Sequence, residues 1–217
     1  MLYYDLAMII YILLFIFLVI PLAFLFFWKV YFLRNPDRDI PLDKDIILAP
    51  ADGKIIEIHE YTKSEVALLK GDKRYRGLIK TITEDVSPHG YLVSIFMSPL
   101  DVHMNRAPIS GKVVSVKHSD GKFLAVNSFE SGLVNEKTEI VIKNKNISVK
   151  MIQIAGFLAR RVVTHVKPGE DVNIGQIVGL INLGSQVTLV LPNTVKLKVS
   201  KGDRVVAGET TIAKINS

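Results

Sequence analysis

An uncharged apolar run at the N-terminus constrains this chain more than any other feature. No charged residue occurs between Leu6 and Trp28, and residues 9–27 are almost wholly aliphatic and aromatic. A single helix needs about 20 such residues to cross the hydrocarbon core of a bilayer. The run is therefore long enough for one span and too short for two. Pro21 lies within it, which leaves a kinked helix and a re-entrant hairpin both open.

The residues flanking this run favour a membrane anchor over a cleaved signal peptide. Asp5 stands where a signal peptide has basic residues, and no small-residue cleavage motif follows the run. Lys29, Arg34 and Arg38 follow it, whereas no Lys or Arg precedes it. The positive-inside rule therefore predicts a cell-membrane protein whose globular part lies on the cytoplasmic side.

Composition divides the chain into three parts. We expect residues 1–33 to form the anchor, residues 34–45 a polar linker, and residues 46–217 one globular domain. The hydrophobic content of 49% is enough to fill a core. The absence of cysteine excludes disulfides and thiolate sites. The net charge of +6 suits an anionic lipid surface or substrate. It would also suit nucleic acid, but the sequence lacks the aromatic and helical signatures of such binding, so no nucleic-acid partner is expected.

Beyond the linker the pattern is typical of β-structure. Short runs rich in Val and Ile alternate with turns rich in Gly, Pro, Asn and Asp. Short helices are expected only over residues 62–69 and 99–102. We expect strands over residues 46–48, 54–58, 91–97, 112–116, 139–142, 148–154, 159–163, 187–191 and 195–199.

Two internal echoes indicate how these strands are arranged. The segment Ala49–Ile55 resembles Ala107–Val113, and Val166–Gly175 recurs 33 positions later as Val199–Gly208. The repeated glycines supply turns that need a positive φ. Such echoes resemble the two halves of a biotinyl- or lipoyl-type barrel-sandwich. We therefore predict a mainly β, barrel-sandwich-like domain with lipoyl/biotinyl-type quasi-repeats, preceded by the N-terminal membrane helix.

A Gly-Ser step lies between two apolar runs near the C-terminus. Gly184-Ser185 separates Gln176–Ile181 from Val187–Leu191. Taken alone, this is an ordinary turn dipeptide. Held between two strands, the same step can cut itself: the Ser hydroxyl attacks the preceding carbonyl, the amide becomes an ester, and elimination leaves a pyruvoyl group.

His103 and Asp52 are the candidates to assist such chemistry. His103 follows the most hydrophobic strand within a polar cluster, which makes it the best general base among five histidines. A capping or core histidine is an equally open interpretation. Asp52 closes the first Pro-x-x-Gly corner, either as a turn residue or as a carboxylate that orients a histidine. Only Asp101 has metal-ligand spacing to His103, so no metal site is predicted.

Taken together, these segments resemble the phosphatidylserine decarboxylases, most closely their short archaetidylserine decarboxylase-like branch. The resemblance runs in order from about Phe32 to the last strand. The matching segments are Phe32–Arg38, Ala49–Gly53, Phe96–His103, Gly121–Leu124, Asn135-Glu136, Gln153–Gly156 with Ala159–Arg161, and Leu183–Ser185.

The resemblance implies a carboxy-lyase for an anionic serine phospholipid, phosphatidylserine or archaetidylserine, which becomes the ethanolamine lipid. It implies self-cleavage between Gly184 and Ser185 into a large chain, 1–184, and a small chain, 185–217. Ser185 would become the pyruvoyl cofactor, which forms a Schiff base with the substrate. The family's Asp-His-Ser triad maps to Asp52, His103 and Ser185.

One departure from the family pattern concerns Arg106. Longer members carry a second histidine three residues after the first, where this chain has Arg106. Either His103 serves both maturation and decarboxylation, or another group replaces the second histidine. Arg106 is itself a candidate to bind the substrate phosphate or carboxylate.

Several questions stay open at the level of sequence. A non-enzymatic membrane adaptor with a lipoyl-like β-sandwich is the competing class, although its usual heptad hairpin is missing from the sequence. The lipid backbone, ester or ether, and the oligomeric state, a homo-oligomer included, also stay open.

Overall fold

The computed structural model describes residues 2–43, 45–62, 82–121, 134–156, 162–182 and 185–216. They belong to two compact units, Met1–Asn35 and Pro36–Ser217. Gly184, Arg160 and Arg161 lie outside the described residues, as does the expected helix over residues 62–69 beyond Thr62, which ends a strand. Residues 36–43, assigned to the linker by composition, belong to the second unit.

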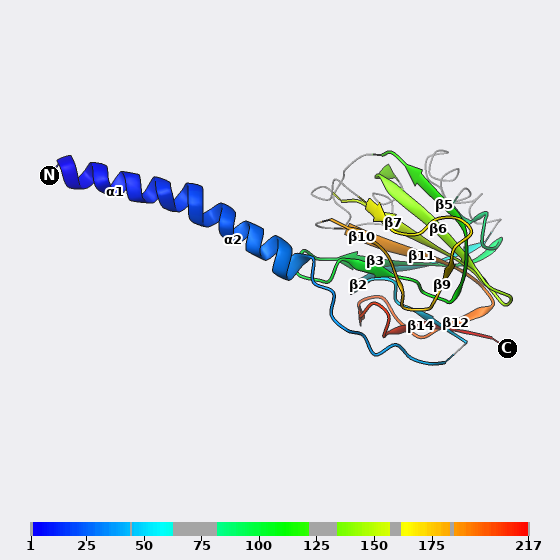
Figure 1. Ribbon diagram of the computed structural model, residues 1–217. Coiled ribbons are helices and arrows are strands. Elements are labelled where there is room, and N and C mark those ends of the chain that lie inside the picture. Colours follow the sequence, from blue (N-terminus) through cyan, green and yellow to red (C-terminus); the bar gives the residue numbers. More distant parts are fainter. Residues whose placement is uncertain are drawn as a thin grey trace. The chain divides into compact units, whose positions relative to one another are not determined.

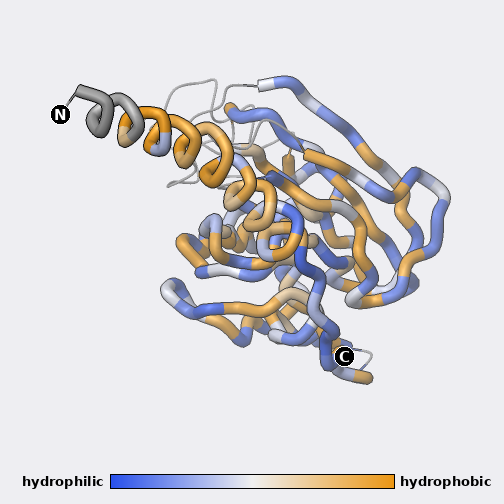
Figure 2. Tube along the Cα trace, turned by 60° about the vertical axis from the view of Figure 1, so that its left-hand side comes forward, coloured by the Kyte–Doolittle hydropathy of each residue, from blue (hydrophilic) through white to orange (hydrophobic). Residues whose placement is uncertain are grey.

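The first unit is a single run of helix along the apolar segment. It consists of α1 (Leu2–Leu14), the π-helical turn η1 (Phe15–Val19), α2 (Ile20–Phe26) and the π-helical turn η2 (Phe27–Phe32). Pro21 has no N–H to donate to the carbonyl of residue 17, which lies in η1. The wider π-helical turn accommodates this missing hydrogen bond without ending the helix. The helix is apolar over Met8–Phe32 (Figure 2), which by length and composition indicates membrane association.

The second unit consists of three antiparallel sheets (Figure 1) and is mainly β, as predicted. One sheet has eight strands in the order β13-β2-β3-β11-β7-β6-β5-β9, and the other two have the orders β1-β14-β12 and β4-β10-β8. The strands are β1 (Ile46–Leu48), β2 (Gly53–Thr62), β3 (His89–Met97), β4 (Met104–Arg106), β5 (Gly111–Ser119), β6 (Lys137–Lys143), β7 (Ser148–Ile154), β8 (Val162–Thr164), β9 (Asp171–Val172), β10 (Ile177–Ile181), β11 (Ser185–Pro192), β12 (Val195–Leu197), β13 (Arg204–Val205) and β14 (Thr211–Ile215).

The three sheets contain two copies of one arrangement of seven strands. In the eight-stranded sheet, β11, β3, β2 and β13 run outward from the centre on one side, and β7, β6, β5 and β9 on the other. The two small sheets correspond strand for strand. The series β1-β2-β3-β11-β12-β13-β14 therefore matches β4-β5-β6-β7-β8-β9-β10. The second series is continuous in the chain and is inserted between β3 and β11 of the first.

The sequence echoes lie at the matching corners of this repeat. The four glycines of the second echo, Gly169, Gly175, Gly202 and Gly208, have positive φ between 77° and 101°, which explains why glycine recurs there. Their N–H groups donate equivalent hydrogen bonds: Gly169 to Val113 O at 2.7 Å, Gly202 to Ile55 O at 2.8 Å, Gly175 to Ala107 O and Gly208 to Ala49 O, both at 2.9 Å. An internal repeat is thus present, whereas its lipoyl/biotinyl type stays a prediction.

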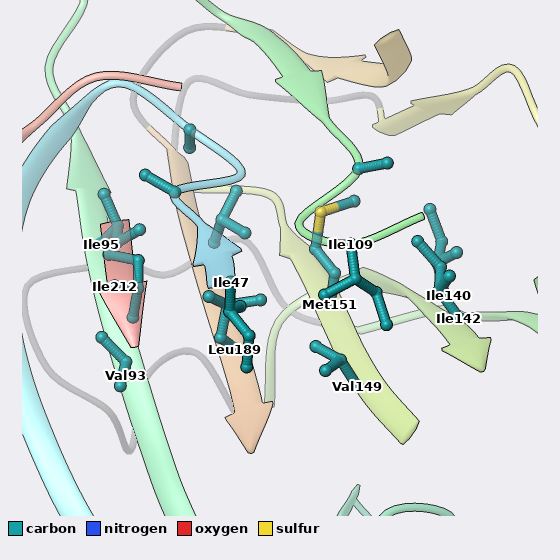
Figure 3. Packing of buried hydrophobic residues seen from close by; sticks show 14 of the residues in the cluster. Ile47, Val93, Ile95, Ile109, Ile140, Ile142, Val149, Met151, Leu189 and Ile212 are labelled. Atoms are coloured by element: carbon teal, nitrogen blue, oxygen red, sulfur yellow. The ribbon is translucent and has the colours of Figure 1, made fainter. Parts of the chain in front are cut away.

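The main core lies between the large sheet and the small sheets. Ile47 of β1 and Ile212 of β14 belong to the same buried cluster as Ile95 of β3 and Leu189 of β11 (Figure 3). A second cluster contains Leu92 of β3 with residues of β2, β7 and β11. The central strands are therefore covered on both faces, and every residue of β11 is buried.

Candidate active site

Ser185 opens the fully buried strand β11. This strand pairs with β3 on one side and β7 on the other, and Ser185 lies opposite Met97, the last residue of β3. Ser185 is 0% exposed. Its Oγ donates a hydrogen bond to Met97 Sδ at 3.5 Å. The apolar run that follows Ser185 thus fixes the serine in regular strand backbone.

The chain leaves β3 through a turn that carries His103. Asp101 N–H donates to Ser98 O at 3.0 Å, so the helix expected over residues 99–102 is wrong and a turn stands there. Buried His103 has its Nδ1 at 2.9 Å from the carbonyl oxygen of Asp101. A carbonyl oxygen can only accept, so Nδ1 carries a proton, and in the neutral ring Nε2 carries the lone pair. His103 therefore has the tautomer that a general base acting through Nε2 requires.

The carboxylate of Asp101 stabilises this turn. Its Oδ2 accepts the Ser98 N–H at 2.8 Å, and its Oδ1 lies 2.9 Å from Arg204 Nη2. Burial raises the pKa of Asp101, but the hydrogen bonds from Ser98 and the charge of Arg204 outweigh burial, so the pKa lies below its usual value. Asp101 is thus ionised at neutral pH and holds the backbone that orients His103.

Asp52 has different partners from those expected. Its two carboxylate oxygens lie 3.1 and 3.0 Å from Arg38 Nη2, and Oδ1 also accepts the Ala207 N–H at 2.8 Å. The His103 ring bonds to the Asp101 carbonyl, and the orientation of His103 by Asp52 stays a prediction. Sequence reasoning missed the role of Arg38, although Arg38 lies in a segment that matches the family.

The second half of the fold shows what part of Asp52 is structural. Ser110 occupies the matching corner, where its Oγ accepts the Ile174 N–H at 2.8 Å. Asp52 accepts the Ala207 N–H at the same 2.8 Å. Both side chains therefore close a corner through a short oxygen acceptor. The ion pair with Arg38 is what distinguishes Asp52 from Ser110.

The sheet register gathers the three candidates at one end of β3. Phe96 pairs with Lys54 of β2 on one side and with Gln186 of β11 on the other. The corner with Asp52 and the start of β11 with Ser185 thus flank the end of β3, and His103 follows that end directly. No hydrogen bond joins any two of these three side chains within the described residues.

Comparison with known proteins decides the family. The family model described as phosphatidylserine decarboxylase matches residues 25–213. The chain belongs to the phosphatidylserine decarboxylase family. It is 42% identical to a Methanocaldococcus jannaschii protein provisionally named archaetidylserine decarboxylase proenzyme. The 199 aligned residues are 91% of this chain and 94% of the relative. It is also 42% identical over 187 residues to the phosphatidylserine decarboxylase proenzyme of Chlorobium phaeobacteroides, covering 86% and 79%.

This family membership confirms the resemblance and makes the chain a carboxy-lyase of the phosphatidylserine decarboxylase type. Both relatives are named as proenzymes, which are converted to active enzymes after synthesis.

In this member of the family, Arg106 joins two parts of the chain. Its Nη1 donates to Gly175 O at 2.9 Å and its Nη2 to Pro36 O at 3.4 Å. Burial and the nearby charge of Arg38 lower the pKa of Arg106 despite nearby acidic groups. Arg106 thus joins the Gly175 corner to the segment before β1, and a contact with substrate stays a prediction.

Proposed function

We propose that the chain is a proenzyme that cuts itself between Gly184 and Ser185 and then decarboxylates a serine phospholipid. The observation that carries this proposal is the placement of Ser185. Its hydroxyl is buried at the start of a central strand, at the same end of β3 as a histidine in the tautomer of a general base. A dry, rigid setting of this kind suits attack on the adjoining backbone carbonyl.

Maturation would proceed in three balanced steps. His103 Nε2 would accept the Oγ proton of Ser185 while Oγ attacks the Gly184 carbonyl carbon. The C–N bond would then break, the histidine would return the proton to the freed amine nitrogen, and an ester would remain. Elimination across the Cα–Cβ bond of residue 185 expels the Gly184 carboxylate. Water then converts the remaining dehydroalanine into a pyruvoyl group and releases ammonia, so no oxidant is required.

The residues around Ser185 fit a pyruvoyl group. Its Oγ contacts a thioether, and the chain has no cysteine that could add to a ketone. The pyruvoyl ketone supplies the electron sink for loss of CO2 from an amine substrate. His103, held by the Asp101 carbonyl, is the candidate to return a proton to the substrate. Asp52 would support this end of the sheet through Arg38.

The proposed substrate is phosphatidylserine or archaetidylserine, as the names of the relatives indicate. The apolar helix would hold the enzyme at the membrane that contains this lipid, and the Lys and Arg residues after it favour a domain on the cytoplasmic side. Arg106 is the candidate to contact the anionic head group, although its two nitrogens already bind backbone carbonyls. We also propose that the repeated halves are of the lipoyl/biotinyl type, which the matching glycine corners support.

The intact mass of the purified protein under denaturing conditions tests this function. We expect two pieces, 1–184 and 185–217, with the smaller one blocked at its first residue. Ser185→Ala should remain whole and should release no CO2 from vesicles that contain phosphatidylserine. A single uncut wild-type chain without decarboxylase activity would refute the proposal, and cleavage of Ser185→Ala would show that the site is misplaced.

A further inference from the structure

A row of buried polar side chains leads away from Ser185. Met97 Sδ accepts both the Ser185 hydroxyl at 3.5 Å and the Asn105 amide Nδ2 at 3.8 Å. Asn105 Oδ1 accepts Gln153 Nε2 at 2.8 Å, and Gln153 Oε1 accepts the Thr164 hydroxyl at 3.3 Å. Asn105, Gln153 and Ser185 are each 0% exposed.

The three hydrogen bonds made by the amides run in one direction, toward Met97, and the Ser185 hydroxyl donates to the same sulfur from the other side. Thr164 donates to Gln153, Gln153 donates to Asn105, and Asn105 donates to Met97. Turning either amide over would place two donors or two acceptors face to face, so the orientation of each amide is determined by its neighbours. Bonds aligned in this way strengthen one another in a buried setting.

The row crosses the interior from one sheet to another. Met97 and Gln153 come from the eight-stranded sheet, whereas Asn105 and Thr164 come from β4 and β8 of a small sheet. Gly179 of β10 leaves the necessary space, because a Cβ there would lie 2.9 Å from Gln153 Nε2. The sequence of β10 therefore accommodates the amide.

Stability alone is a weak reason to bury these amides. A hydrogen-bonded polar pair in a core contributes little more than apolar side chains of the same shape. What the row fixes is the position of the Met97 sulfur, which is the acceptor for the Ser185 hydroxyl. A thioether is a weak acceptor, so it can orient the hydroxyl and still release its proton readily to a base.

We infer that Asn105 and Gln153 are positioning residues for self-cleavage: they hold Met97 so that its sulfur sets the orientation of the Ser185 hydroxyl before attack. This inference rests on the proposed function. Neither residue touches the reacting atoms, and both act through Met97.

Two variants of similar size test this role, with a matched control. Asn105→Leu and Gln153→Met remove the hydrogen bonds of the row, and each should slow cleavage of the folded precursor by about tenfold to a hundredfold. Ser94→Ala is the control, because Ser94 lies on β3 like Met97 and is also buried. The substitution removes a hydrogen bond between the Ser94 and Thr188 hydroxyls, which lie 3.0 Å apart. Ser94→Ala should cleave at the wild-type rate. The pH at which the cleavage rate is half-maximal should be the same in all four chains, since the base is untouched.

A second measurement does not depend on cleavage. In the full Ser185→Ala chain, the 13C-labelled ε-methyl resonance of Met97 should be shifted or broadened by Asn105→Leu and by Gln153→Met, but not by Ser94→Ala. Wild-type cleavage rates in both row variants, an equal loss in Ser94→Ala, or an unchanged Met97 resonance would each overturn the inference. Failure of the wild-type chain to cleave would instead refute the proposed function, and the Met97 resonance would still decide whether the row holds the sulfur.

Discussion

Replacing Asp52 with serine separates its two roles. The corner at Ser110 shows that a serine hydroxyl can accept the N–H that closes such a turn, at 2.8 Å in both halves. Asp52→Ser should therefore keep the corner and lose only the ion pair with Arg38. Asp52→Ala should lose both.

The expected energies follow from burial. Removing one partner of a buried ion pair costs about 3–5 kcal/mol. The Arg38 side chain is 8% exposed, but its Nη1 keeps Glu209 at 3.7 Å, and Asp52 is 15% exposed. We therefore expect Asp52→Ser to lower the free energy of unfolding by about 2–3 kcal/mol. Asp52→Ala should cost about 1 kcal/mol more, because the Ala207 N–H then loses its acceptor.

Urea unfolding in the Ser185→Ala background measures both costs, since every variant is then a single uncut chain. Ser110→Ala is the matched control, and its cost should equal the difference between Asp52→Ala and Asp52→Ser. Equal stabilities of Asp52→Ser and Asp52→Ala, or no cost for Ser110→Ala, would refute the equivalence of the two corners. If Asp52→Ser were as stable as the wild type, the ion pair with Arg38 would not stabilise the fold as proposed.

Three further changes test other parts of the structure. Lys150→Met should destabilise the fold by about 3–5 kcal/mol, because the nearly buried Glu139, 2.9 Å away, loses its partner. Adding Glu139→Leu should restore most of the lost stability, measured by thermal unfolding. No recovery would contradict the unpaired carboxylate as the cause of the loss. Gly53→Ala should fold poorly, because φ at residue 53 is +151° and a Cβ would collide with the Phe96 carbonyl. Circular dichroism should show little folded protein, and a wild-type yield of folded protein would contradict this expectation. Asp101→Asn should cost about 1 kcal/mol at pH 7, because the folded pKa of Asp101 is lowered and its contribution is present above the ordinary value of about 3.9. That cost should vanish as the pH falls through the lowered pKa, and a cost independent of pH would exclude the charge as its source.

Local signals were sufficient to predict much of the fold. Val and Ile runs bounded by turn residues predicted most of the long strands. The second echo revealed a repeat because its four corners need a positive φ that glycine supplies. The strands β9 and β13 were missed, since two residues carry no periodicity, and the list of expected strands also lacked β4, β10 and β14. The pairing of β3 with β11 was also beyond local reasoning, because the whole second half of the repeat lies between them.

The contacts of the candidate site residues could not be predicted from the sequence. Ser185 and His103 lie at one end of β3, and their roles in cleavage stay predictions. The orientation of His103 depends on a backbone carbonyl, which every residue has and no sequence pattern marks. The partner of Asp52 depends on how residues 36–40 pack within the second unit. In the sequence, the charge of Arg38 is the signal of this contact.

The position of β11 has a further consequence for a chain cut before Ser185. The 33-residue product would contain the central strand β11 and also β12 and β14, and so would contribute to two different sheets. Hydrogen bonds to β3 and β7 would hold it on both sides. Folding of the precursor is a unimolecular reaction, but reassembly of the two products would be bimolecular and would depend on concentration. Maturation would therefore exchange a reversible folding equilibrium for kinetic stability: a mature molecule that unfolds in dilute solution would not recover its structure, whereas its precursor would.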